Sequence, residues 1–398
     1  MTTPQRIHSL DSIRGIAMLG ILFMNIAAIA LPDAAYVNPC WRDGSCTSTD
    51  LWVYSFQQLF FDARFMTLFC LMFGAGMALL WQKLNDKNYP AKRVLVRRLS
   101  WLLLFGALHG IFIWQGDILI SYALAGLLVV VTKMLQRQPK TLITVGVSLF
   151  IAGHVFIGII WLLYPWIPED MAVEFAAGYT LSPDETSDQI ALWQGPYSGQ
   201  IYEQFLAVLE LLFGTVFTGM FLIWFGLMIL GIALYKLNIF HRGLAPALQW
   251  GLLAIGLGLS GINLALAWDN QFQSARNLYS AWNTMAALPV ALAYLSLLAR
   301  WCHKHQRAIP MVSAVGRMAF TFYIFQSMTM VLLFRWIAPE LYGQLDRLSL
   351  FAVALVMTAL QITLANLYLR KWQQGPLEKG WRYLTYRGVK ASGNEQQL

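Results

Sequence analysis

Residues 12–31 read SIRGIAMLGILFMNIAAIAL, and this stretch decides the fold. Apart from Ser12, Arg14 and Asn25, every residue in it is apolar or glycine. An α-helix needs roughly 20 such residues to cross the hydrocarbon core of a bilayer. No small-residue cleavage site follows a short apolar core, so we expect this segment to stay in the protein as the first transmembrane helix rather than be removed as a signal peptide.

The rest of the chain has the same character. The 398 residues are 58% hydrophobic and only 12% charged, whereas a soluble domain carries roughly 25% charged residues. We therefore predict an all-α, polytopic transmembrane helical bundle with about ten spans. They are expected near residues 12–31, 64–82, 98–115, 117–135, 141–164, 213–235, 245–268, 278–299, 311–335 and 348–369.

Two further segments, 50–62 and 197–211, are apolar but interrupted by Gln, Asp or Glu, which is typical of interfacial helices. The formal charge of +8 does not indicate nucleic-acid binding, because the Lys and Arg residues form short clusters between apolar runs. With both termini in the cytoplasm, most of these cations fall in cytoplasmic segments, as the positive-inside rule requires. Residues 1–370 are then one integral membrane domain and residues 371–398 a cytoplasmic tail.

Ionisable residues inside membrane spans are costly and are the first candidates for a functional site. At the cytoplasmic mouth of the first span, Asp11 and Arg14 are three residues apart on one helical face. They could form a local ion pair at a capped helix start, or bind a phosphate or head group. Asn25 lies farther along the same face. Arg64 opens the second span, where it could snorkel to the outer surface or serve a site.

His109 and Asp117 form the most informative pair. His109 is near the outer end of the third predicted span, and Asp117 opens the fourth after a tight turn, with Tyr122 shortly behind it. Such a hairpin can bring the carboxylate to the imidazole. A histidine oriented by a carboxylate is a general base for a hydroxyl or an amine. The alternative is a buried structural histidine that bonds a neighbouring helix.

The ninth predicted span contributes Arg317, Tyr323 and Gln326, for which packing and pocket-lining roles are both open. Cys40 and Cys46 bracket a short external loop, where they could form a disulfide or remain free thiols. We find no plausible four-ligand metal set, and so expect no metal cofactor.

Several sequence blocks together resemble the bacterial YeiB family. They are LDSIRGIAMLGILFMN at the start, LFGAG in the second span, the His109–Tyr122 hairpin, the GRMA block at Gly316, and the GPLE and WRYLTY blocks of the tail. The likeness covers nearly the whole chain and implies a multi-pass protein of the bacterial cytoplasmic membrane.

More remotely, the first span resembles that of the transmembrane acyltransferases, which include heparan-α-glucosaminide N-acetyltransferase and bacterial sugar O-acetyltransferases. The resemblance implies that Asp11 and Arg14 belong to a donor-side motif. The O-acyltransferases carry His where this chain has Asn25. The lysosomal enzyme heparan-α-glucosaminide N-acetyltransferase uses a His from its first luminal loop. The corresponding loop of this chain contains no His. His109 would have to take its place.

Two functions remain in competition. The first is transfer of an acyl group from cytoplasmic acyl-CoA, such as acetyl-CoA as cosubstrate, to a small-molecule or lipid-linked glycan acceptor at the outer side. His109 and Asp117 would supply the base, and Asn25, Tyr323 or Gln326 the oxyanion contacts. The second is transport of a small or lipid-like solute, coupled to protons through His109 and Asp117. A non-catalytic lipid-binding role is a third reading. Membrane lipids are expected partners in each case, and monomer and homodimer both stay open.

Overall fold

A computed structural model describes residues 8–163, 166, 168–169, 180–270, 272 and 278–391. The elements in chain order are α1 (His8–Ala30), α2 (Ala34–Val37), α3 (Ser48–Phe60), α4 (Arg64–Asp86), α5 (Ala91–Phe112), α6 (Leu119–Val131), η1 (Met134–Gln136), α7 (Pro139–Leu163), α9 (Pro183–Gln194), α10 (Tyr197–Phe217), α11 (Met220–Lys236), α12 (Ile239–Arg242), α13 (Pro246–Asp269), α14 (Leu278–His305), α15 (Val312–Arg317), α16 (Ala319–Leu332), η3 (Leu333–Ile337), η4 (Pro339–Leu341), α17 (Arg347–Tyr368) and α18 (Pro376–Tyr386).

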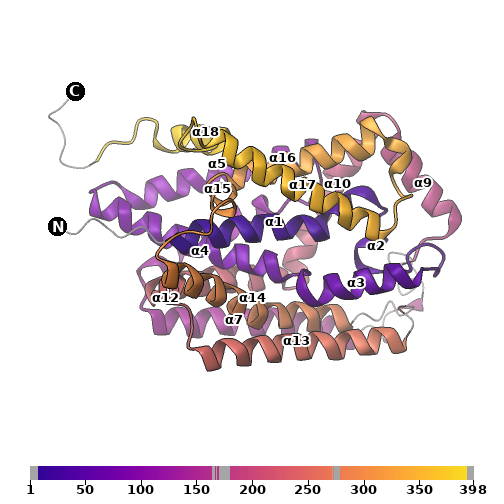
Figure 1. The fold of residues 1–398 in the computed structure, drawn as a ribbon, viewed down its shortest axis with the longest axis horizontal. Coiled ribbons are helices and arrows are strands. Elements are labelled where there is room, and N and C mark those ends of the chain that lie inside the picture. Colours follow the sequence, from indigo (N-terminus) through magenta and orange to yellow (C-terminus); the bar gives the residue numbers. More distant parts are fainter. Residues whose placement is uncertain are drawn as a thin grey trace.

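The all-α polytopic bundle is confirmed. Within the described residues, nine helical segments are long and apolar enough to cross a membrane, and one of them runs through α3 and α4 together. Helices α1, α7, α13 and α14 follow the long axis of the molecule (Figure 1). The start of α1 and the helix α18 lie at one end, which we call the inner end, and α2 and α9 lie at the opposite, outer end.

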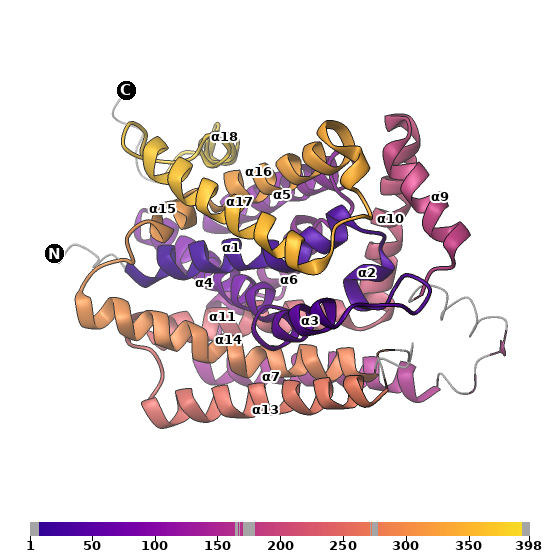
Figure 2. The ribbon, with the colours of Figure 1, turned by 45° about the vertical axis from the view of Figure 1, so that its right-hand side comes forward.

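The structure differs from the prediction of one continuous span over residues 213–235. Helix α11 has only 17 residues and begins after Gly219, whose φ of 78° is left-handed. Gly219 packs against Gly153, near the midpoint of α7. Helix α10 runs on to Phe217, beyond the interfacial segment predicted over 197–211, and Figure 2 shows it passing obliquely across the outer part of the bundle. The two helices together therefore form one broken crossing.

Other boundaries agree more closely with the sequence. Helix α3 matches the interrupted segment predicted over 50–62, and it joins α4 through a turn at Ala63, which has a left-handed φ of 57°. The span predicted over 117–135 is only partly helical, because α6 has 13 residues and a short 3₁₀ turn follows it. The span predicted over 311–335 is divided into α15, α16 and the π-helical turn η3.

Glycines allow the central helices to approach each other closely. A Cβ at Gly316 of α15 would lie 1.8 Å from the carbonyl oxygen of Asp11 in α1, and a Cβ at Gly15 would lie 2.0 Å from that of Val312. Helices α4 and α11 cross in the same way at Gly74 and Gly231. Small residues let backbones come together inside a membrane, where helix association depends on packing. The crossing of α1 and α15 thus joins two sequence blocks from opposite ends of the chain.

Candidate functional site

His109 and Asp117 meet at the outer end of the α5–α6 hairpin. The Nδ1 atom of His109 lies 2.7 Å from Oδ2 of Asp117, and both side chains are almost completely buried. Gly106 and Gly110, four residues apart on one face of α5, make this approach possible. A Cβ at Gly106 would lie only 2.8 Å from Oδ1 of Asp117. The glycines therefore open the space in which the carboxylate reaches the imidazole.

Tyr323 of α16 completes this cluster. Its hydroxyl accepts a hydrogen bond from the backbone N–H of Ile118 at 3.2 Å and lies 3.5 Å from Oδ2 of Asp117, to which it can donate. Its ring centroid is 5.1 Å from that of His109. Asp117 also accepts from the backbone N–H of Ile120 at 2.9 Å, which helps to begin α6. The Asp117 carboxylate thus supports the start of α6 and also orients the imidazole of His109.

The other ring nitrogen of His109, Nε2, is buried and has no hydrogen-bond partner among the described residues. An ionised Asp117 favours the tautomer in which Nδ1 carries the proton and donates to the carboxylate. This arrangement leaves the lone pair of Nε2 free. Buried polar atoms are normally paired, so an unpaired imidazole nitrogen is a candidate proton acceptor.

A basic cavity of about 1090 Å³ opens beside this cluster toward the inner end. Its deeper wall includes Tyr122, Tyr323 and many apolar side chains of α4 and α5. Glu378 is its single acidic lining residue, whereas eight lining residues are cations: Arg14, Lys83, Lys87, Arg98, Arg317, Lys379, Arg382 and Arg387. Such a cavity attracts anions, and its low-dielectric walls strengthen that attraction.

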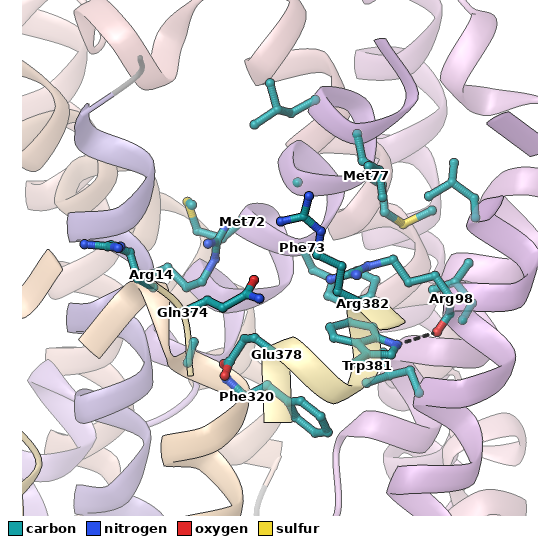
Figure 3. Close-up of a pocket in the computed structure, with 18 of the residues that line it drawn as sticks. Arg14, Met72, Phe73, Met77, Arg98, Phe320, Gln374, Glu378, Trp381 and Arg382 are labelled. Atoms are coloured by element: carbon teal, nitrogen blue, oxygen red, sulfur yellow. Dashed lines mark hydrogen bonds between the residues drawn. The ribbon is translucent and has the colours of Figure 1, made fainter. Parts of the chain in front are cut away.

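Arg14 lies at one side of the inner cavity, and Arg98 and Arg382 lie at the other, with Glu378 between them (Figure 3). The predicted pairing of Arg14 with Asp11 is present, with 3.6 Å between the nearest nitrogen and oxygen. Arg14 is also 3.5 Å from the carbonyl oxygen of Gly316. Both side chains of the pair remain partly exposed, so the arginine can still contact a ligand.

The tail helix α18 forms part of the cavity wall, which sequence reasoning missed. Trp381 donates from Nε1 to the carbonyl oxygen of Arg98 at 2.9 Å, and the guanidinium of Arg98 stacks 3.4 Å from the Trp381 ring centroid. Glu378 accepts the backbone N–H groups of Phe320 and Thr321 at the start of α16. The tail was assigned to the cytoplasm as a separate segment, but its aromatic face could have indicated docking.

A second cavity, of about 550 Å³, lies toward the outer end. Asn25, Asp62 and Asp117 line it, together with aromatic residues such as Tyr36 and Trp114. None of its lining residues is Lys or Arg. The outer cavity is therefore lined mostly by aliphatic and aromatic side chains with amides and carboxylates among them, in contrast to the cationic inner cavity.

The two cavities approach each other at the His109 cluster. Asp117 and Ile118 line the outer cavity, while Tyr323 and Tyr122 line the inner one. The Tyr323 hydroxyl contacts both Asp117 and Ile118, so the wall at this point is one side chain thick. His109 belongs to neither lining and lies directly behind Tyr323 and Asp117.

Comparison with known proteins finds relatives over nearly the whole chain. The chain is 31% identical to "Uncharacterized protein YeiB" of Escherichia coli (strain K12) over 401 residues, covering 97% of both chains. The chain belongs to the YeiB family. It is also 27% identical to "Uncharacterized protein YxaH" of Bacillus subtilis (strain 168), covering 96% of this chain and 95% of that protein. Residues 234–388 match the family described as "Protein of unknown function (DUF418)".

In this YeiB-family chain, the DUF418 match includes α15, α16 and α18, and therefore Tyr323, Glu378 and Trp381. The histidine hairpin of α5 and α6 lies outside the matched residues. The cluster at His109 is thus assembled from the N-terminal half of the YeiB-family chain and the DUF418 segment.

Arg64 does not snorkel to the surface, and that interpretation is wrong for this YeiB-family member. Its side chain is fully buried and donates to Ser260 and, at 2.8 Å, to Oδ1 of Asn283. Asn283 in turn donates to Asp62 and to Gln58, each at 2.6 Å. This network connects α3 and α4 to α13 and α14, and it holds Asp62 and Gln58 in the wall of the outer cavity.

The remaining predicted site residues of the YeiB-family chain do not lie together in the structure. Gln326 is 1% exposed, has no hydrogen-bond partner for its amide among the described residues, and lines neither cavity. Tyr122 donates to the carbonyl oxygen of Met66 at 3.1 Å, while Arg317 donates to that of Gln373 at 2.5 Å. Asn25 belongs to the outer cavity, so the structure does not place it with Arg14.

Cys40 and Cys46 form a disulfide in the outer loop. Of the described residues, no group of three or more His, Cys, Asp or Glu could hold a metal ion.

Proposed function

We propose that this YeiB-family protein is an acyltransferase of the bacterial cytoplasmic membrane. It moves an acyl group from cytoplasmic acyl-CoA to a hydroxyl or amine acceptor, free or lipid-linked, that enters from the outer side. The observation that carries the proposal is the approach of two chemically different cavities to the His109–Asp117–Tyr323 cluster. An enzyme whose two substrates come from opposite sides of a membrane needs such an arrangement, because donor and acceptor must reach one base from separate compartments.

The inner cavity suits the donor in charge. Acyl-CoA carries several phosphate charges, and Arg14, Arg98 and Arg382 offer guanidinium groups from opposite walls. Tyr383, which is exposed, supplies an aromatic surface in the same lining. Apolar side chains such as Phe69 and Leu102 line the part nearer Tyr323, where the acyl group and pantetheine arm would lie.

The chemistry follows from the free Nε2 of His109. That nitrogen takes the proton of the acceptor hydroxyl or amine as its oxygen or nitrogen forms a bond to the thioester carbonyl carbon. The carbon–sulfur bond then breaks, and the thiolate of CoA receives the proton from the imidazolium. Asp117 stabilises the imidazolium between these steps. Access to Nε2 requires side chains of the cluster to move, since His109 lines neither cavity.

Calorimetric binding of acetyl-CoA and longer acyl-CoAs to the purified protein tests this proposal. We expect Arg14→Ala to weaken binding about 10- to 100-fold, because a charge-assisted hydrogen bond contributes about 1.5–3 kcal/mol. His109→Ala should bind donor normally but lose transfer. Arg370→Ala is the matched control, since Arg370 is exposed and outside the cavity. Absence of acyl-CoA binding by the wild-type protein would refute the proposal.

Transport is the second candidate, and the broken crossing at Gly219 favours it. Helices interrupted within the membrane are a feature of transporter binding sites, and Met220 and Trp224 of α11 line the outer cavity. A proton-coupled carrier would move solute into proteoliposomes in the absence of any acyl-CoA. Solute uptake that needs His109 and proceeds without a donor would replace the enzyme proposal with this one.

A further inference from the structure

The tail helix α18 buries little of its own surface against the bundle. The structure describes α18 throughout, and of its 11 residues only Trp381 and Thr385 are buried. An isolated helix shorter than about 12–15 residues is marginally stable in water, and segments with few buried apolar contacts open most readily from a folded protein. The docked position of α18 therefore depends strongly on the polar and charged groups around it.

The charges of the inner cavity oppose this docking. Of the eight cations in the lining, Lys379, Arg382 and Arg387 come from α18 and the residue that follows it, and the other five come from the bundle. Docking brings these two sets of like charges together. Arg382 and Arg14 both act unfavourably on the charge of Arg98. Such repulsion is stronger beside the low-dielectric interior of the protein than in water.

Glu378 offsets part of this repulsion and is the one acid among the described residues of the lining. Its carboxylate accepts from the backbone N–H of Phe320 at 2.8 Å and from that of Thr321 at 3.1 Å. The backbone N–H of Leu377 donates in turn to Oγ1 of Thr321 at 3.2 Å. A Cβ at Gly375 would lie 2.6 Å from Oγ1 of Thr321 and would overlap the Glu378 carboxylate. One carboxylate against eight cations leaves the lining strongly positive.

An anionic ligand would reverse the sign of the interaction between the tail and the bundle. Arg382 of the tail and Arg98 of the bundle lie on the same side of the cavity (Figure 3), where anionic groups can pair with both sets of cations. A ligand that binds the docked state more tightly shifts the population toward that state. By thermodynamic linkage, the docked helix strengthens binding of the ligand by the same factor.

We propose that α18 is a lid that closes on the inner cavity when a polyanionic ligand binds there. Without the ligand, repulsion between the tail and bundle cations favours release of α18, and the contacts of Glu378 hold a fraction of the molecules in the docked state. The inference rests on the proposed function only in taking the inner cavity as the site of an anionic ligand, and it applies to any polyanion that binds between the two sets of cations.

Labelling of a cysteine placed at Thr385 measures release of α18, because that side chain is fully buried when the helix is docked. The full-length Thr385→Cys protein, purified in a non-ionic detergent, is treated with a maleimide, and the labelled peptide is identified by mass spectrometry. We expect tripolyphosphate to slow labelling at least threefold. Glu378→Gln should speed labelling about three- to tenfold without the anion, since neutral hydrogen bonds replace charge-assisted ones. Hydrogen–deuterium exchange of residues 376–386 in the chain without the new cysteine gives a second readout.

Lys83→Gln combined with Lys87→Gln removes two bundle cations from the lining and leaves α18 itself unchanged. This double variant should slow labelling about twofold without the anion and should respond less to tripolyphosphate. Lys133→Gln combined with Lys140→Gln is the matched control, because both of these exposed cations lie outside the lining. Labelling and exchange that tripolyphosphate leaves unchanged, or equal behaviour of the two double variants, would overturn the inference.

The same measurements separate the lid from the proposed function. If tripolyphosphate slows labelling but acetyl-CoA does not bind, the lid is supported and the proposed function is refuted. If acetyl-CoA binds but neither it nor tripolyphosphate changes labelling or exchange, the lid alone is refuted.

Discussion

The crossing of α1 and α15 should fail when one methyl group is added at Gly316. In Gly316→Ala the new Cβ would lie 1.8 Å from the carbonyl oxygen of Asp11, whereas real Cβ atoms essentially never come closer than 3.0 Å. The helices must therefore separate by the difference, about 1.2 Å. Overpacking of this kind typically costs about 1–3 kcal/mol. The thermal unfolding temperature of the detergent-purified protein should fall accordingly.

The same displacement should affect the inner cavity. Arg14 lies 3.5 Å from the carbonyl oxygen of Gly316, at the limit of a hydrogen bond, so a shift of this size removes the contact. We expect acetyl-CoA binding to weaken about tenfold, equivalent to about 1.4 kcal/mol.

Gly258→Ala is the matched control, because a Cβ there meets no atom within 4 Å. It should be neutral or slightly stabilising, since Ala is favoured over Gly in a helix by about 0.5–1 kcal/mol. If Gly316→Ala has the same unfolding temperature and the same affinity for acetyl-CoA as Gly258→Ala, the close crossing does not position Arg14 and the reasoning is refuted.

Two further predictions concern stability. Arg64→Ala should destabilise the protein by about 3–5 kcal/mol, because it leaves the buried Asn283 and the partly buried Asp62 without their cation. Equal unfolding temperatures for the variant and the wild type would disprove the network. Asp346 caps α17 by accepting from the backbone N–H of Ser349, and the bonds to Ser349 lower its pKa below the usual 3.8. Stability from a depressed carboxyl pKa is present above the unfolded-state pKa and is lost as the pH falls through the folded-state pKa. Asp346→Ala should therefore cost about 1 kcal/mol at pH 7 and progressively less below pH 4, and a pH-independent difference would contradict this role.

The sequence predicts most of the fold because bilayer crossing imposes a length and a composition on each helix. It fails where one crossing is divided between two helices. The apolar run over 213–235 shows no break, yet Gly219 adopts a left-handed φ and starts α11 beside Gly153. Glycine residues elsewhere in the spans, such as Gly258, remain helical. A glycine alone therefore does not reveal a break, which depends on the helix that packs against it.

The candidate site was predictable where it is local in the sequence. The turn between His109 and Asp117 is short, so the hairpin itself brings the two side chains together. Tyr323 was identified as a polar residue in a span, but its contact with Asp117 is tertiary and has no local signal. Arg98, Glu378 and Trp381 were missed as site residues because a tail helix appears cytoplasmic and solvated until its docking against α5 and α16 is known.

The opposite character of the two cavities bears on the choice between enzyme and transporter. A transported solute must be accommodated on both sides of the wall at Tyr323. A molecule attracted by Arg14 and Arg98 would meet a largely apolar lining without Lys or Arg beyond it. An enzyme has the reverse requirement, because two different substrates should each be held on their own side while only the acyl group passes. For an enzyme, the boundary at Asp117 and Tyr323 would be the reaction centre. The same wall would be an obstacle to a solute that had to cross it intact.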